Sequence, residues 1–245
     1  IPVQRGEVPT TPVHKLSPLR EDEIVQAAFA IPIEKNDIGE RYVLTVTRQG
    51  MIKKSLVTEL PGASANRFTL VKVNEGDELF RVLLKKKKKE VLLTTAKGMS
   101  IRFSETDVRP MGLLAAGVNG IKLKEGDYVV GASLIEPGNE VGLVTNQGWA
   151  KRIKAEEFPQ QGRYGQGVIS WKLKGEDSIV VQLCGKLTDR VVCHFRKSAS
   201  KVFTLTNAVE RTRQANGQIL FKLKPDDELI GFTCLDDFSS YWEKA

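Results

Sequence analysis

Leu123-Lys-Glu-Gly-Asp127 and Leu173-Lys-Gly-Glu-Asp177 lie fifty residues apart and share one pattern. Val73-Asn-Glu-Gly-Asp77 and Leu223-Lys-Pro-Asp-Asp227 continue the same spacing on either side. Ten residues upstream of the aspartate, the last three copies also carry a glycine, at Gly117, Gly167 and Gly217. A shared period of this length indicates one supersecondary unit repeated in a linear or radial array.

Each copy predicts four short β-strands. In the first full copy, Tyr42–Val46 alternates and is rich in β-formers, Arg48–Gly50 signals a turn and Met51–Leu56 follows as a second strand, which predicts a hairpin over Tyr42–Leu56. Phe68–Val73 and Glu78–Leu84 alternate in the same way and predict the third and fourth strands. A four-stranded unit cannot bury its faces alone, so we expect an all-β, propeller-like ring of blades.

The repeat predicts a single domain over residues 1–245. A leading segment around Asp22 matches only the back half of a copy. About five blades are therefore expected, from four full copies and a half. The predicted boundaries are 1–39 for the leading half, 40–89, 90–139, 140–189 and 190–235 for the full copies, and 236–245 for a C-terminal tail.

The composition is that of an ordinary soluble protein with a moderate positive charge. Thirty-seven Lys and Arg face 30 Asp and Glu, a net charge of +7 that permits a polyanionic partner. No apolar run approaches the ~20 residues that span a bilayer, so no membrane partner is expected. Cys184, Cys193 and Cys234 fit no zinc spacing and predict reduced thiols in the cytoplasm. With only His14 and His194 present, neither a metal site nor histidine-based catalysis is expected.

Basic residues recur in register with the repeat and form the candidate site. Lys151 and Lys201 are one period apart, as are Arg163 and Arg213, so each pair should occupy one slot on successive blades. A stripe of such residues around a rim could follow the phosphates of a bent duplex. The candidate DNA-binding residues are Lys53, Lys54, Arg102, Arg109, Lys151, Arg152, Arg163, Lys201 and Arg213.

Lys85–Lys89 is a run of five lysines where the first copy meets the second. Two interpretations stay open for this run: a solvated connector between blades, or an additional phosphate contact.

Four stretches resemble a known family over essentially the whole chain. Val108–Asp127 resembles a blade signature of the C-terminal domain of the DNA gyrase and topoisomerase IV A subunits. Thr47–Lys54 and Thr95–Phe103 are similar to that family's first hairpin, and Gln161–Ile169 is similar to another blade.

The resemblance implies a β-pinwheel, a ring whose blades exchange strands, with double-stranded DNA bent or wrapped around a basic rim. It implies sequence-nonspecific binding within a type IIA topoisomerase. The implied partners are the remainder of the A subunit and the ATPase B subunit, in the cytoplasm at the nucleoid. The family's cleavage tyrosine and ATPase site have no counterpart here, so this chain alone should be neither catalytic nor cofactor-bound. ATP and Mg²⁺ would be used elsewhere in the complete enzyme.

The chain also departs from the family pattern. Arg5–Pro12 does not carry the glycine- and arginine-rich box that gyrase A subunits typically have in their first blade. Leu113, Leu114, Ala116 and Asn119 stand where relatives often have arginines. Gyrase-like and topoisomerase IV-like readings therefore stay open, as does closure of the ring. The alternative function is a propeller-like scaffold that binds other proteins.

Overall fold

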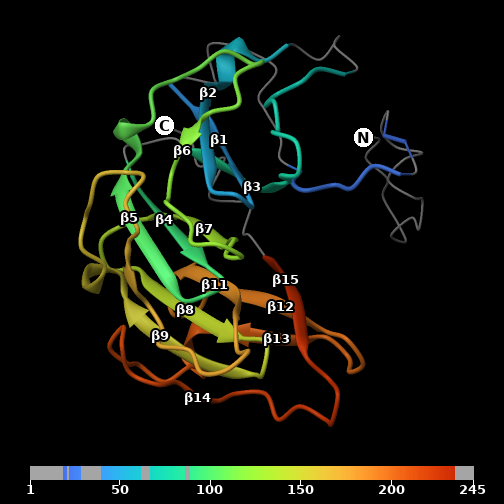
Figure 1. The fold of residues 1–245 in the computed structure, drawn as a ribbon, viewed down its shortest axis with the longest axis vertical. Helices are drawn as coiled ribbons and strands as arrows, with labels where there is room; N and C mark the ends of the chain where they lie inside the picture. Colours follow the sequence, from blue (N-terminus) through green and yellow to red (C-terminus); the bar gives the residue numbers. More distant parts are fainter. Residues whose placement is uncertain (1–18, 21, 29–39, 62–66, 86–88, 235–245) are drawn as a thin grey trace.

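The computed structural model describes residues 19–20, 22–28, 40–61, 67–85 and 89–234. Regular structure in these residues consists of β-strands and four one-turn 3₁₀ helices (Figure 1). The 3₁₀ helices recur once per copy, each after the second strand. They are η1 (Val57–Glu59), η2 (Glu105–Asp107), η3 (Ala155–Glu157) and η4 (Leu205–Asn207).

The strands form four antiparallel sheets that follow one another along an arc (Figure 1). Sheet 1 contains β3 (Leu79–Lys85), β1 (Tyr42–Thr47), β2 (Met51–Leu56) and β6 (Val118–Asn119), in that spatial order. Sheet 2 contains β7 (Val129–Ile135), β4 (Glu90–Thr95), β5 (Met99–Ser104) and β10 (Val168–Ile169). Sheet 3 contains β11 (Ile179–Gly185), β8 (Glu140–Thr145), β9 (Trp149–Lys154) and β14 (Gln218–Ile219). Sheet 4 contains β15 (Leu229–Cys234), β12 (Arg190–Phe195) and β13 (Lys201–Thr204).

Sheets 1 to 3 each receive their outermost strand from the following copy. Strand β6 belongs to the second copy by sequence but pairs with β2 of the first, through Met51–Asn119 and Ile52–Val118. Strands β10 and β14 repeat this exchange on β5 and β9. The all-β fold, the ring-like arrangement of sheets and the exchange of strands are thereby confirmed.

The hydrophobic core lies between successive sheets. Leu93 packs with Leu44 of sheet 1, whereas its neighbour Leu92 packs with Leu143 of sheet 3. A third cluster joins Val144 of sheet 3 to Phe203 of sheet 4. Adjacent residues of one strand point to opposite faces, so a middle sheet is buried on both faces.

Three of the four strands predicted for the first copy are confirmed by the structure. Strands β1 and β2 form the hairpin expected at Tyr42–Leu56, and β3 is the strand expected at Glu78–Leu84. Phe68–Val73 forms no strand, so that prediction is wrong. The equivalent segments become strands β6, β10 and β14 by pairing with the sheet before them. In the described residues no sheet precedes sheet 1.

The repeating aspartates connect two turns within each sheet. Asp127 Oδ1 accepts hydrogen bonds from the backbone N–H groups of Lys97 and Tyr128, at 3.0 and 2.9 Å. Asp77 and Asp227 do the same in the first and fourth copies. A buttressing role in the turns explains why the aspartate recurs.

The leading half copy is recognisable by the same turn. The Glu23 N–H donates to Arg20 O at 3.2 Å, as the Asp127 N–H donates to Lys124 O at 3.1 Å. The structural counterpart of the repeating aspartate is therefore Glu23. The sequence alignment placed this counterpart at Asp22, one residue too early. Most of the leading half, and the tail at 236–245, lie outside the described residues.

Cys184 and Cys193 are free thiols, and burial raises the pKa of each to about 12. Such thiols stay protonated and unreactive at neutral pH. The Cys234 side chain lies outside the described part of the structure. Within the described ranges, no helix has the length and apolar character needed to cross a bilayer.

Candidate nucleic-acid interface

Three of the predicted rim lysines are buried. The exposed fractions of Lys53, Lys54 and Lys151 are 1%, 5% and 0%. The Lys53 ammonium donates to the carbonyls of Leu70 and Leu113 at 2.5 and 2.6 Å. Phosphates cannot reach these ammonium groups without displacing the next copy, so the burial of the three lysines argues against a direct contact with DNA.

Lys151 is held in a cage of backbone carbonyls supplied by the fourth copy. Its ammonium lies 2.5 Å from Arg213 O, 2.8 Å from Ala215 O and 3.3 Å from Thr212 O. It also lies 4.8 Å from the centre of the Trp171 ring. Burial lowers the pKa of Lys151 to about 8, and burial also lowers the pKa of Lys53. Both lysines hold one copy against the next.

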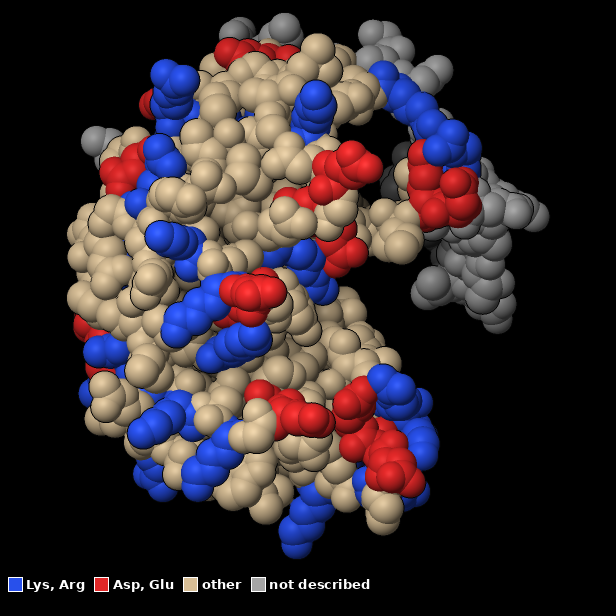
Figure 2. All heavy atoms as spheres, viewed as in Figure 1, with Lys and Arg blue, Asp and Glu red and all other residues tan. Residues whose placement is uncertain are grey.

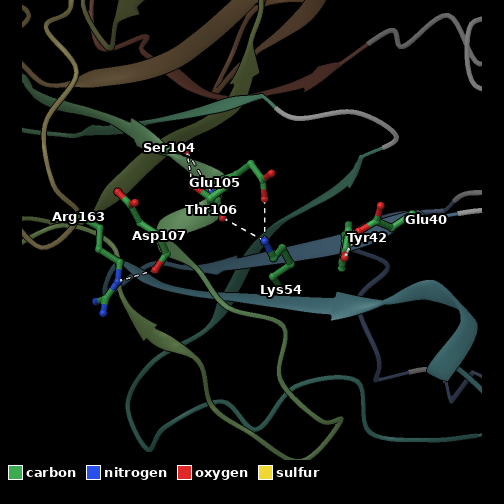
Figure 3. Close-up of polar contacts among 8 residues, drawn as sticks. All are labelled: Glu40, Tyr42, Lys54, Ser104, Glu105, Thr106, Asp107 and Arg163. Carbon is green, nitrogen blue, oxygen red and sulfur yellow. Dashed lines mark hydrogen bonds and ion pairs between the residues drawn. The ribbon is translucent and has the colours of Figure 1, made fainter.

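Lys54, Arg102 and Arg152 occupy a second shared position and join neighbouring sheets. Figure 3 shows the Lys54 ammonium directed at Glu105, whose carboxylate lies 2.7 Å away in η2 of the next copy. Lys54 also donates to the Glu105 carbonyl at 3.2 Å. Both partners are almost fully buried, so this ion pair is part of the packing between sheets 1 and 2.

The two arginines of this position make the equivalent contacts. Arg102 pairs with Glu90 and donates to the carbonyls of Ala155 and Phe158, at 2.9 and 3.1 Å. Each arginine keeps 19% of its side chain exposed.

Arg152 completes the series. It pairs with Glu140 and Glu210 at 3.3 and 3.2 Å and donates to Ala208 O at 3.3 Å. Arg102 and Arg152 are therefore clamps between sheets, and a phosphate could reach only their exposed edges.

Arg163 and Arg213 share a third position and bind carbonyls of the preceding copy. Arg163 donates to Asp107 O at 3.2 Å, drawn in Figure 3, and to Asn119 O at 2.9 Å. Arg213 donates to Ile169 O at 3.0 Å, one period further on. The predicted register is correct, but both guanidinium groups support exchange strands while remaining half-buried.

Arg109 and Lys201 are the two predicted residues with exposed side chains. Arg109 lies two residues after the end of η2. The Lys201 ammonium lies 5.6 and 5.9 Å from the ring centres of Phe195 and Phe221. Of the five lysines at 85–89, Lys89 forms an ion pair with Glu136 at 2.7 Å, while 86–88 lie outside the described residues.

The structure reveals a second basic series that the sequence reasoning missed. It consists of exposed lysines that follow the exchange position in every copy, three residues after the outermost strand where one is present. Their fifty-residue spacing was visible five residues before each repeating aspartate. The series comprises Lys72, Lys122, Lys172 and Lys222, with Lys124, Lys174 and Lys224 two residues further on.

Charge is unevenly distributed over the face of the molecule drawn in Figure 2. In Figure 2, Lys and Arg recur along the outer border of the arc, and many of the Asp and Glu side chains lie nearer its hollowed side. Each lysine pair is followed by an exposed acidic turn residue: Glu125, Glu176 or Asp226. On this face, basic side chains therefore predominate along the outer border.

Antiparallel sheets that pass their outermost strands backward along an arc define the β-pinwheel class of propeller-like domains. The chain belongs to the family described as "DNA gyrase C-terminal domain, beta-propeller". The family model matches one stretch per copy and covers more than half of the chain, at residues 41–84, 89–136, 140–181 and 201–236.

Curated proteins similar to this chain include DNA gyrase A subunits. The subunit of Halalkalibacterium halodurans is 36% identical over 110 residues, which is 45% of this chain and 13% of that protein. The Escherichia coli subunit is also 36% identical over 110 residues, 45% of this chain and 12% of that protein. The match thus covers a small part of each relative's length.

Two solved structures share the fold over almost the entire chain. The C-terminal domain of DNA topoisomerase IV superposes with a TM-score of 0.80 and 27% identity, over 90% of this chain and 69% of that one. The DNA gyrase A C-terminal domain gives 0.78 over 94% of this chain and 76% of that one. Its identity is 22%, so it supports the fold alone.

Proposed function

We propose that this domain binds double-stranded DNA without sequence preference and bends it along the outer border of the arc. The observation that carries the proposal is the series Lys122, Lys172 and Lys222, exposed at one position on successive copies. Lysines at a regular spacing can neutralise successive phosphates and release counterions. Contacts to phosphate position the duplex and do not read its bases.

Bending is the step that requires several contacts in line. Bending a 20–30 base-pair site sharply costs on the order of 1–6 kcal/mol. A single exposed lysine cannot offset that cost, whereas a curved row of them favours the bent form over the straight one. The arc of sheets supplies the curvature, and the exchange strands hold the row in place.

Family membership supports a wider assignment, which is also part of the proposal. The domain acts within the A subunit of a type IIA topoisomerase, gyrase or topoisomerase IV, together with the ATPase B subunit in the cytoplasm at the nucleoid. The domain takes no cofactor and catalyses nothing itself, while ATP and Mg²⁺ serve other parts of the enzyme. Its contribution is to present bent DNA for passage.

The salt dependence of DNA binding tests the proposal. Replacing Lys122, Lys172 and Lys222 together by Ala should reduce the slope of log affinity against log salt by about 3, at roughly 0.9 per phosphate contact. The control replaces three exposed lysines outside the series, Lys154, Lys186 and Lys197, which removes the same charge. Equal loss in both triple variants would contradict a registered contact, as would a wild-type slope near zero.

One observation favours the alternative of a protein-interaction scaffold. Leu114 and Ile219 expose 75% and 54% of their surface, and Tyr164 and Ile169 are also exposed. Exposed apolar groups at recurring positions are a feature of protein-binding surfaces. Loss of a protein partner, with DNA affinity unchanged, on replacing Leu114 and Ile219 by Ser would favour this alternative.

A further inference from the structure

Sheet 4 differs from the other sheets in having an unpaired outer edge among the described residues. Strand β13 has four residues, whereas β2, β5 and β9 have six. Ala199 and Ser200 stand one period after Trp149 and Ala150, which pair with β14, yet they belong to no strand. Strand β13 is therefore shorter at the end where no described residue pairs with it.

Two side chains of β13 are also more exposed than their counterparts in β9. Val202 exposes 52% of its surface, and Lys201 is exposed, whereas Lys151 one period earlier is fully buried. Three carbonyls surround the Lys151 ammonium, whereas the contacts of the Lys201 ammonium within the described residues are with the rings of Phe195 and Phe221.

The backbone of β13 offers hydrogen bonds outward. At the corresponding place in β9, the Arg152 N–H donates to Val209 O and the Arg152 carbonyl accepts from Arg211 N, both at 2.9 Å. Lys54 and Arg102 accept in the same way, from Met111 and Gln161 at 2.8 Å. In the described ranges, Val202 has no counterpart of these contacts. An unpaired strand edge is a template for an added strand.

The contacts of β6, β10 and β14 with sheets 1 to 3 show what kind of segment could pair with β13 of sheet 4. Each donor places a glycine against the acceptor strand: a Cβ at Gly117, Gly167 or Gly217 would lie 2.5, 2.3 or 2.4 Å from a backbone oxygen. The first copy has Arg67 at this position, and its segment forms no strand. A donor therefore needs glycine at the joint, which excludes Arg67 and the residues after it.

We propose that the outer edge of β13 is a binding site for an extended, glycine-containing exchange segment of a further repeat of this type. The segment pairs antiparallel with Ala199 and Ser200, as β14 pairs with Trp149 and Ala150, with its glycine against this edge and an aliphatic residue one or two positions later. A short loop before the glycine supplies carbonyls to the Lys201 ammonium and backbone partners to Val202. This site is independent of DNA binding.

The probe is a synthetic, fluorescently labelled peptide of Val209–Lys222, the segment that completes sheet 3. Fluorescence anisotropy with the 245-residue chain should show saturable one-to-one binding. The same peptide with Gly217→Arg should not bind, because a side chain at the joint meets the acceptor backbone.

Two protein variants locate the contact. Val202→Pro removes the outward N–H while leaving its neighbours to pair with β12, and should weaken the peptide by at least about tenfold. Lys201→Met keeps the size of an exposed side chain and should weaken it by about tenfold. Lys197→Met, an exposed lysine of the same sheet, is the matched control and should change nothing. Thermal unfolding confirms that each variant is folded.

Four results would overturn the proposal. One is absence of peptide binding, and another is equal binding of the Gly217→Arg peptide. Binding that Val202→Pro leaves unchanged would show that the peptide displaced β14 from sheet 3. Binding seen only after removal of residues 1–18, or concentration-dependent dimers in sedimentation that the peptide dissolves, would assign the edge to the leading segment or to a second copy.

Discussion

Sheets 3 and 4 present the same lysine in opposite environments. Lys151 and Lys201 are one period apart and occupy equivalent positions, paired with Leu143 and Cys193. Lys151 is buried among three carbonyls, and Lys201 is exposed. The difference comes entirely from the copy that follows: the fourth copy covers β9, and no described residue covers β13.

This comparison shows that a residue's role in an exchanged array is decided by its neighbour. In sheet 2, Ile101 fills the same position as Lys151 and is also fully buried. The position is a core position whether it holds lysine or isoleucine. Lys53 and Lys151, which occupy this position in sheets 1 and 3, therefore join successive copies, and their charge is weak evidence for DNA binding.

The largest expected effect on stability comes from blocking the close contact between Gly217 and strand β9 of sheet 3. Gly217→Arg copies the residue found at Arg67 and places a Cβ 2.4 Å from Ala150 O. It should expel β14 and lower the free energy of unfolding by about 3 kcal/mol. Urea unfolding measures this, with Gly231→Ala as control because no atom lies within 4 Å of its Cβ position. Similar losses in both variants would mean that the exchange adds no stability.

Replacing Lys151 and Lys201 by Ala should lower the free energy of unfolding by different amounts, and the larger loss should be somewhat smaller than that of Gly217→Arg. Lys151→Ala leaves a cavity and three buried carbonyls without their donor, which should cost about 2–3 kcal/mol. Lys201→Ala removes an exposed side chain and should cost less than about 0.5 kcal/mol. Equal costs in urea unfolding would show that sheet 4 is covered in solution.

The pH dependence of stability should single out Lys151. Its pKa is about 8 in the folded protein and 10.5 in the unfolded chain, so the unfolded state holds more protons between these values. Stability from this group therefore rises from pH 8 to pH 10, by about 1–2 kcal/mol.

Urea unfolding of Lys151→Met should lack this rise, whereas Lys201→Met should retain it. If the difference between Lys151→Met and the wild type is the same at both pH values, the ammonium is not held in a desolvated cage.

The smallest expected effect comes from removing the side chain of Arg152, which follows Lys151 and contacts the fourth copy. Arg152→Ala breaks contacts to Glu140, Glu210 and Ala208 O, with a cost of about 1 kcal/mol. Lys154→Ala is the control, since its ion pair with Glu210 spans 3.5 Å and its side chain is 60% exposed. If the melting temperature falls no more for Arg152→Ala than for Lys154→Ala, the contacts of Arg152 do not stabilise the packing between copies.

The period and the alternation of residues sufficed to predict the fold. Turn residues and β-branched alternation are local signals, so the hairpin at Tyr42–Leu56 and strand β3 could be recognised from sequence. Phe68–Val73 carries the same alternation as its counterparts, yet a strand also needs an acceptor and a glycine at the joint. Arg67 was the visible sign that this segment differs.

The candidate site was harder to predict because both faces of a sheet are covered. Lys53 and Lys54 point to opposite faces of β2, and alternation normally leaves one face in water. Here one lysine meets carbonyls and the other meets Glu105. Lys122 and its counterparts lie in loops, where no periodic rule separates an exposed lysine from a packed one, so register alone could have found them.

The backward passing of strands means that the unit of sequence and the unit of folding are offset. A cut at a copy boundary, after residue 189, would remove β14 and leave β9 with the bare edge that β13 has now. A cut after Lys222 would keep sheet 3 complete. Recombination or truncation at the apparent repeat borders therefore divides a sheet, and intact modules begin and end inside the copies.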